Sequence, residues 1–126
     1  MKWETVVKLG RELPEVEEGF SYGTPALEVR GTKLIARLKE DGETLVFRLE
    51  DVDLQEILIE TQPELYFITD HYRGWPAVLA RLTRLRAPEC RERLEAAWRE
   101  QAPRTLVRRY DEARAAPKGR ARAGQR

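Results

Sequence analysis

Apolar and polar side chains follow two periods along this chain, one typical of α-helices and one typical of β-strands. Residues 3–13 place apolar side chains at offsets of three and four, and Pro14 interrupts the pattern. Residues 19–50 instead alternate apolar with polar side chains, with turn-forming breaks at residues 31–32 and 41–42. The pattern predicts a first helix followed by antiparallel strands.

The predicted strand within residues 33–39 indicates how the two faces of the sheet differ. Successive side chains of a strand point to opposite faces, so alternation gives one apolar face and one mostly cationic face. The apolar set is Leu34, Ala36 and Leu38, and the opposite set is Lys33, Ile35, Arg37 and Lys39. We therefore expect the first set to face the core and the second to meet solvent.

A short helix and two further strands are predicted next. Asp53 and Glu56 have the spacing of a capping box, which marks the start of a helix. The apolar stripe of that helix is predicted to be Leu54, Ile57 and Leu58. Residues 64–69 and 76–82 have the composition of strands. A second pair of strands therefore follows the helix.

Two helices complete the predicted order. Pro88 suits the first turn of a helix, and Pro103 can end that helix and start the next. The first of these helices carries an apolar stripe of Cys90, Leu94, Ala97 and Trp98. Strand groups that alternate with helix groups predict an α+β two-layer sandwich, with helices on one face of an antiparallel sheet.

Length and composition narrow the class of protein. With 126 residues and 41% hydrophobic content, the chain suits one domain, which we expect to span residues 1–116. Residues 117–126 carry four cations and no apolar side chain larger than alanine, so we expect a disordered basic tail. The single cysteine and single histidine predict neither a disulfide nor a metal site or other cofactor. Without a long apolar run, we expect a cytoplasmic protein that has no membrane partner. We also expect a monomer.

Charge is distributed unevenly along the chain. Residues 1–70 carry 8 basic and 16 acidic side chains, a net charge of −8, whereas residues 71–126 carry 15 basic and 6 acidic side chains, a net charge of +9. The second half could present a surface to an anionic partner. The alternative is that these charges form solvated helix faces that pair with one another.

The segment DHYRGWPA, residues 70–77, combines the only histidine with a tyrosine, an arginine and a tryptophan. A catalytic interpretation makes His71 a general base beside a serine or cysteine nucleophile. The chain offers only Ser21 and Cys90, and Cys90 lies on a predicted buried stripe. We therefore expect no enzymatic activity. The remaining interpretations of the segment are a binding edge and a turn that shapes the next strand.

Three segments in this order resemble the MmcQ/YjbR family of small bacterial proteins. They are SYGTPALEVRGTKLIARL (21–38), HYRGWPAVLARL (71–82) and AAWREQAPRTLVRRYD (96–111). The resemblance implies a secretion-chaperone-like α+β fold that is compared with a double-wing arrangement, and it implies DNA binding. One departure is Ala77, where members often carry a large aromatic residue after the proline.

Two classes of binding function follow. A nucleic-acid interface would use the predicted cationic face. That face comprises Lys33, Arg37 and Lys39 together with Arg30, Arg48 and Arg81. The candidate binding residues are Tyr22, Lys33, Arg37, His71, Tyr72, Arg73, Trp75 and Arg81. The alternative is a protein- or small-molecule-binding module that uses the HYRGWP edge. A continuous positive sheet face favours DNA or single-stranded nucleic acid, and an uncharged concave patch around Trp75 favours a protein partner.

Overall fold

The computed structural model describes the backbone of residues 1–123 and the side chains of residues 1–115. The helices are α1 (Trp3–Gly10), α2 (Asp53–Thr61), α3 (Ala87–Gln101) and α4 (Arg104–Ala123), with short 3-10 helices η1 (Asp70–Tyr72) and η2 (Leu82–Arg84). The strands are β1 (Val16–Ser21), β2 (Thr24–Val29), β3 (Lys33–Leu38), β4 (Thr44–Arg48), β5 (Tyr66–Phe67) and β6 (Ala77–Arg81). Across these described residues, no helix combines the length and apolar character that a membrane crossing requires.

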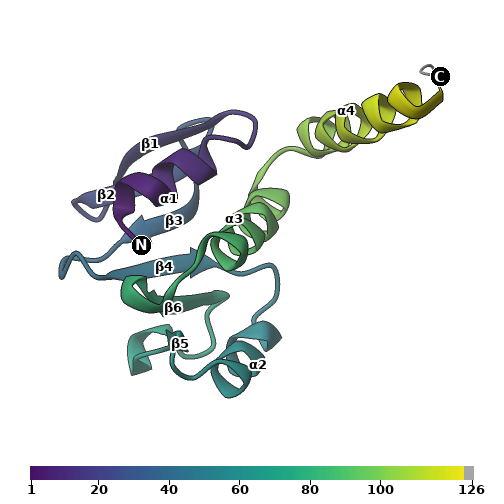
Figure 1. Ribbon diagram of the computed structural model, residues 1–126. Coiled ribbons are helices and arrows are strands. Elements are labelled where there is room, and N and C mark those ends of the chain that lie inside the picture. Colours follow the sequence, from purple (N-terminus) through teal and green to yellow (C-terminus); the bar gives the residue numbers. More distant parts are fainter. Residues whose placement is uncertain (124–126) are drawn as a thin grey trace.

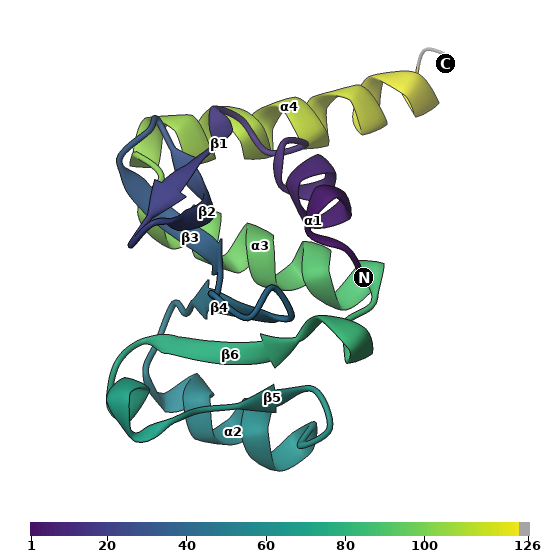
Figure 2. The same cartoon turned by 90° about the vertical axis from the view of Figure 1, so that its left-hand side faces the viewer.

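The strands form one sheet in the order β1-β2-β3-β4-β6-β5, and every neighbouring pair is antiparallel. Figure 1 shows α3 lying across this sheet, and Figure 2 shows β4, β6 and β5 one below another with α2 beside β5. The predicted α+β class with an antiparallel sheet is confirmed. The two strand groups predicted from the sequence join edge to edge, because β6 pairs with β4.

A tight hairpin divides the first predicted strand segment into β1 and β2. Ser21 pairs with Thr24, so only Tyr22 and Gly23 form the turn. Both have positive φ angles, 56° and 79°, as a two-residue hairpin turn with the twist of the flanking strands requires. Glycine adopts this conformation readily, whereas a bulky residue such as Tyr22 seldom does.

A β-bulge in β3 changes the predicted assignment of its faces. Leu27 pairs with Ala36 and Glu28 pairs with Leu34, so Ile35 is the extra residue. A bulge places two successive side chains on the same face, and Ile35 and Ala36 are both fully buried in the core. The predicted strict alternation was therefore wrong for the residues of β3 that precede Ala36. Leu34 lies on the opposite face, and Ile35 belongs to the core.

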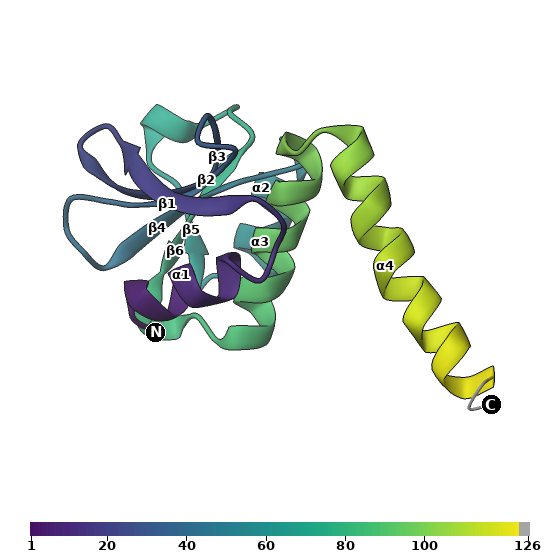
Figure 3. The same cartoon turned by 90° about the horizontal axis from the view of Figure 1, so that it is seen from above.

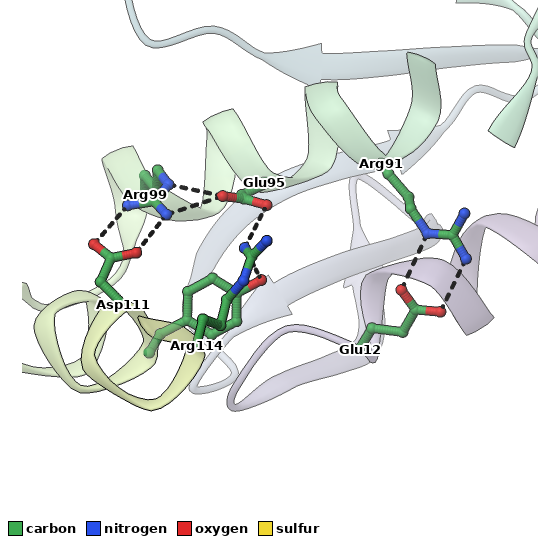
Figure 4. A network of polar contacts seen from close by, with 7 residues as sticks. Glu12, Arg91, Glu95, Arg99, Asp111 and Arg114 are labelled. Carbon is green, nitrogen blue, oxygen red and sulfur yellow. Dashed lines mark hydrogen bonds and ion pairs between the residues drawn. The ribbon is translucent and has the colours of Figure 1, made fainter. Parts of the chain in front are cut away.

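The core lies between the sheet and the helices α1 and α3, and Figure 3 shows α3 between the sheet and α4. The predicted stripe of α3 is confirmed, since its four members are all buried: Cys90, Leu94, Ala97 and Trp98. The Trp98 indole Nε1 donates a hydrogen bond to the Pro14 carbonyl at 2.9 Å. Arg91 of α3 also forms an ion pair at 3.3 Å with Glu12, just after α1 (Figure 4). These contacts fix α3 against the first helix.

The start of α2 differs from the predicted capping box. Val52 is the N-cap residue, and no side chain caps the helix. Asp51 instead accepts a hydrogen bond from the Asp53 backbone amide at 2.9 Å. Of the predicted stripe, Leu54 and Leu58 pack against the core, whereas Ile57 is 51% exposed. The predicted position of the helix is therefore confirmed. The predicted capping box is wrong, and so is the predicted burial of Ile57.

Helix α4 docks on α3 through aromatic and charged contacts. The Tyr110 ring meets the Trp98 ring edge to face at 4.9 Å between centroids. Arg99 lies between Glu95 and Asp111, and Figure 4 shows its guanidinium bonded to both carboxylates. The hydrogen bonds from Arg99 hold the pKa of Asp111 below its ordinary value. The first turns of α4 therefore belong to the folded domain.

The predicted disordered tail, residues 117–126, overlaps the last part of α4, which is assigned to Ala123. The side chains of residues 116–123 and the whole of residues 124–126 lie outside the described part of the chain. The boundary at residue 116 stays a prediction.

Candidate functional site

A hollow of about 520 Å³ opens on the sheet face opposite α1 and α3. Its lining residues come from the β1–β2 turn, from β3, β4 and the turn between them, and from the segment that leads from η1 into β6. They are Tyr22, Leu34, Arg37, Lys39, Glu40, Val46, Arg48, His71, Tyr72, Trp75, Pro76 and Ala77. We call this site the aromatic-cationic hollow. Its volume lies within the range of ligand pockets in proteins.

The sheet register explains why these residues meet. Val46 pairs with Leu79, and Arg48 pairs with Ala77, so neighbouring strands present these side chains to the same face. The bulge in β3 adds Leu34 to that face. The floor of the hollow thus combines the apolar Leu34 and Val46 with the cationic Arg37 and Arg48, and its aromatic groups are carried at the rim by the two neighbouring turns.

Arg37 contacts three of the segments that surround the hollow. Its side chain is almost fully buried, and its Nη1 donates a hydrogen bond to the Thr24 hydroxyl at 3.0 Å. Its Nη2 donates to the Tyr72 hydroxyl at 3.2 Å. The guanidinium carbon also lies 5.1 Å from the centroid of the Tyr22 ring, within the range of a cation–π contact. One buried cation thereby connects β2, the first hairpin turn and η1.

Lys39 and Arg48 are the cations of the hollow whose charged groups have fewer partners than that of Arg37. The Lys39 ammonium lies 5.5 Å from the centroid of the Tyr72 ring, and neither side chain forms an ion pair within the described residues. Nε of Arg48 is buried and has no hydrogen-bond partner among those residues. A buried polar nitrogen without a partner is unusual, because it loses its hydration without a replacement. The two terminal nitrogens of Arg48 also lack a partner among those residues and are not buried, so they, and not Nε, can meet an incoming acceptor.

Gln55 of α2 holds the HYRGWP segment in place although it lies outside the hollow. Its side-chain nitrogen is within 3.0 Å of three backbone carbonyls, those of Tyr72, Trp75 and Ala77. Its side-chain oxygen accepts a hydrogen bond from the Gly74 amide at 3.4 Å. Gln55 is buried, so these contacts are shielded from water. The side chain therefore sets the path of the backbone that carries the aromatic rim.

The rim itself is largely exposed. Trp75 is 65% exposed and Tyr22 is 84% exposed, which leaves most of each side chain accessible to a ligand. His71 is exposed and lies edge to face against the Tyr72 ring, with 5.5 Å between centroids. Exposed aromatic rings beside cations are the groups that stack on planar ligands and pair with anions.

Five of the eight residues predicted for binding line the hollow: Tyr22, Arg37, His71, Tyr72 and Trp75. The other three lie elsewhere. Lys33 is exposed at the start of β3, and Arg73 pairs with Asp70 at 3.0 Å. Arg81 covers the Phe67 ring at 4.3 Å beside β5. The structure therefore groups the predicted aromatic residues but separates most of the predicted cations.

The predicted positive sheet face is correspondingly interrupted. Arg30 lies in the turn after β2 and forms an ion pair with Glu15 at 2.5 Å. Lys39 and Arg48 belong to the hollow but were absent from the predicted site, although the sequence assigned both to the cationic face. Gln55 gave no signal at all, because a polar residue next to an apolar helix stripe normally meets solvent. Only the fold brings it against the HYRGWP backbone.

Comparison with known proteins identifies the family. The model of the family described as YjbR matches residues 11–100. The chain is 36% identical over 69 residues to the Uncharacterized protein Mb2600 of Mycobacterium bovis and to the Uncharacterized proteins MT2646 and Rv2570 of Mycobacterium tuberculosis. These matches cover 55% of this chain and 54% of each relative, so the chain spans about half the length of the curated relatives it matches. No solved structure matches the chain. Since the family match covers well over half of its residues, the chain belongs to the YjbR family.

Proposed function

We propose that this chain is a non-enzymatic protein that binds single-stranded nucleic acid in the aromatic-cationic hollow. One observation carries the proposal: three cations and three aromatic rings line the same concavity, with Glu40 as its one acidic lining residue. Cations neutralise phosphates, and exposed rings stack on unpaired bases. This combination suits a nucleic acid better than a neutral ligand.

Single strands fit the geometry better than a duplex. The accessible rings, Tyr22 and Trp75, lie on turns around a concavity, where an unpaired base could reach a ring face. In a duplex the bases are already stacked and offer only their edges. No α-helix of the described chain lines the hollow, and the three-residue η1 is too short to enter a major groove as a recognition helix.

A protein partner is the second candidate, because exposed aromatic side chains extend beyond the hollow. Phe20 of β1 is 73% exposed, on the sheet face opposite the hollow, because it alternates in step with Glu18, which accepts a hydrogen bond from Trp3 of α1. Aromatic residues are common anchors of protein interfaces. The patch around Trp75 is concave, as such an interface requires, but it is cationic. We therefore place this function second.

Fluorescence anisotropy of labelled single-stranded and double-stranded oligonucleotides, titrated at several salt concentrations, tests the proposal. We expect single strands to bind more tightly and affinity to fall as salt rises. Trp75→Ala should weaken single-strand binding by about 1 to 3 kcal/mol. Lys33→Ala is the matched control on the same strand as Arg37, and it should bind like the wild type. Absent binding at low salt, or wild-type affinity in Trp75→Ala, would instead favour the protein partner.

A further inference from the structure

We propose that the hollow binds a single nucleotide that bears a terminal phosphate, with Arg48 as the phosphate-binding residue. The inference rests on the proposed use of the hollow for nucleic acid, and it specifies which part of the ligand is recognised. The same chemistry is offered by a free mononucleotide and by the phosphorylated end of a strand. Either ligand would place its phosphate at the floor and its base at the aromatic rim.

The charge of the hollow fits a phosphate monoester better than a phosphodiester. Leaving His71 aside, the lining cations Arg37, Lys39 and Arg48 face one carboxylate, that of Glu40, which leaves an excess of two positive charges. A phosphate monoester carries a charge of about −1.5 to −2 at neutral pH. Each phosphodiester of a strand interior carries about −1. A terminal phosphate therefore neutralises the site more fully.

The guanidinium groups of Arg37 and Arg48 differ in how many partners they already have. The guanidinium of Arg37 already donates to the Thr24 and Tyr72 hydroxyls, and its Nη1 lies 3.9 Å from Glu40. The Arg48 side chain forms no hydrogen bond or ion pair within the described residues, and its terminal nitrogens, unlike Nε, are not buried. A planar guanidinium can bind two phosphate oxygens at once. Arg48 is thus the guanidinium that remains available to a phosphate.

Acidic side chains limit how far a strand could continue beyond the hollow. At one end of β3, Glu28 is paired opposite Leu34 and therefore shares the face of the hollow. Its neighbour on β1 is Glu17, which adds a second carboxylate across the ladder. At the other end lies Glu40, followed by Asp41 in the β3–β4 turn. A phosphodiester chain that ran along β3 would meet negative charge in both directions, whereas a single nucleotide in the hollow would meet only Glu40.

The size of the hollow agrees with one nucleotide. About 520 Å³ is enough for one base, one sugar and one phosphate, within the usual range of small-ligand sites. Tyr22 and Trp75 offer exposed rings at its rim for one base. The structure therefore favours recognition of an end over recognition of a long tract.

Anisotropy titrations with four probes test this inference. Short single-stranded oligonucleotides, labelled at the opposite end, would carry a phosphate or a hydroxyl at the 5′ end and, in a second pair, at the 3′ end. A free mononucleotide serves as competitor, and calorimetry measures its binding directly. We expect one phosphorylated probe to bind about tenfold or more tightly than its hydroxyl partner. Arg48→Gln should abolish that preference, whereas Arg84→Gln, which removes the same charge from an exposed site outside the hollow, should retain it.

The outcomes separate the inference from the proposed function. Equal affinity for phosphate-ended and hydroxyl-ended strands overturns end recognition and leaves single-strand binding standing. A mononucleotide that binds when no strand does, and that fails to bind Arg48→Gln, supports the inference and overturns the proposed function. Failure of every probe overturns both. If Arg48→Gln does not fold, as judged by its thermal melt, Lys39→Gln replaces it with the same expected loss of preference.

Discussion

Nη2 of Arg37 donates a hydrogen bond to the Tyr72 hydroxyl across 35 residues of sequence, at 3.2 Å. This contact joins the middle of β3 to the η1 helix, and so joins two of the three segments that resemble the family. Because the same guanidinium supports Thr24 and the Tyr22 ring, Arg37 shapes the hollow more than it exposes charge to a ligand. It is best described as a positioning residue.

Arg37→Ala should therefore reduce stability as well as binding. Its side chain is buried, and its removal leaves the Thr24 and Tyr72 hydroxyls without a donor. We expect the free energy of unfolding to fall by about 2 to 4 kcal/mol. Urea denaturation measures this change. Lys33→Ala, at an exposed position of the same strand, should stay within about 0.5 kcal/mol of the wild type; similar values for both variants would show that Arg37 is not structural.

Gln55→Glu offers a test of the contacts that hold the HYRGWP backbone. An ionised carboxylate would face the carbonyls of Tyr72, Trp75 and Ala77 with no hydrogen to donate. Protonation restores one donor, so the pKa of the new carboxyl should be raised in the folded state. The variant should then lose stability as pH rises above its unfolded pKa of about 4.3. Urea denaturation at pH 4 and pH 7, with the wild type as reference, measures the loss, and a pH-independent difference would contradict this arrangement.

Truncation of Trp98 should cost much more stability than truncation of Trp75. Trp98 is fully buried, donates to the Pro14 carbonyl and meets the Tyr110 ring. Trp98→Ala should cost about 3 to 5 kcal/mol of stability because it leaves a large cavity. Trp75→Ala, at a largely exposed position, should cost under about 1 kcal/mol. Thermal or urea unfolding compares them directly; a stable Trp98→Ala would mean that α3 does not pack as described.

Cys90 should be unreactive in the folded protein. Burial raises the pKa of its thiol from an ordinary value of 9.0 to about 12, so the thiolate is absent at neutral pH. A thiol reagent at pH 8 should label the chain only after denaturation. Because the unfolded thiol deprotonates first, this group should also lower stability as pH rises from 9 to 12. Rapid labelling of the native protein would contradict burial of α3 against the core.

The parts of the fold that follow from local periodicity could be predicted from the sequence. The stripe Cys90, Leu94, Ala97 and Trp98 is helical in period, and all four residues are buried. The bulge at Ile35 could not be predicted, because pairing with β2 decides the register and alternation alone assumes none. The Tyr22-Gly23 turn was likewise missed, since a tyrosine there gives no ordinary turn signal.

The candidate site was predictable mainly in its aromatic part, since Arg37 is the one predicted arginine or lysine that lines the hollow. Tyr22, Tyr72 and Trp75 stand out in short unusual segments, and all three line the hollow. Cations carry no such signal, because a sequence does not say which of them already has a partner. Arg73 is paired with Asp70, whereas Arg48 has a buried nitrogen without one. That difference depends on tertiary contacts.

The most direct test of the account uses the three tryptophan indoles as reporters in a ¹H–¹⁵N correlation spectrum. Trp3 and Trp98 donate through Nε1 to Glu18 and Pro14, whereas Trp75 lines the hollow and is exposed. On titration with a phosphorylated single-stranded oligonucleotide at low salt, the Trp75 indole signal should shift while those of Trp3 and Trp98 stay in place. Arg48→Gln should strongly weaken the shift. A spectrum in which Trp75 does not move, or in which Trp3 moves instead, would contradict binding in the hollow.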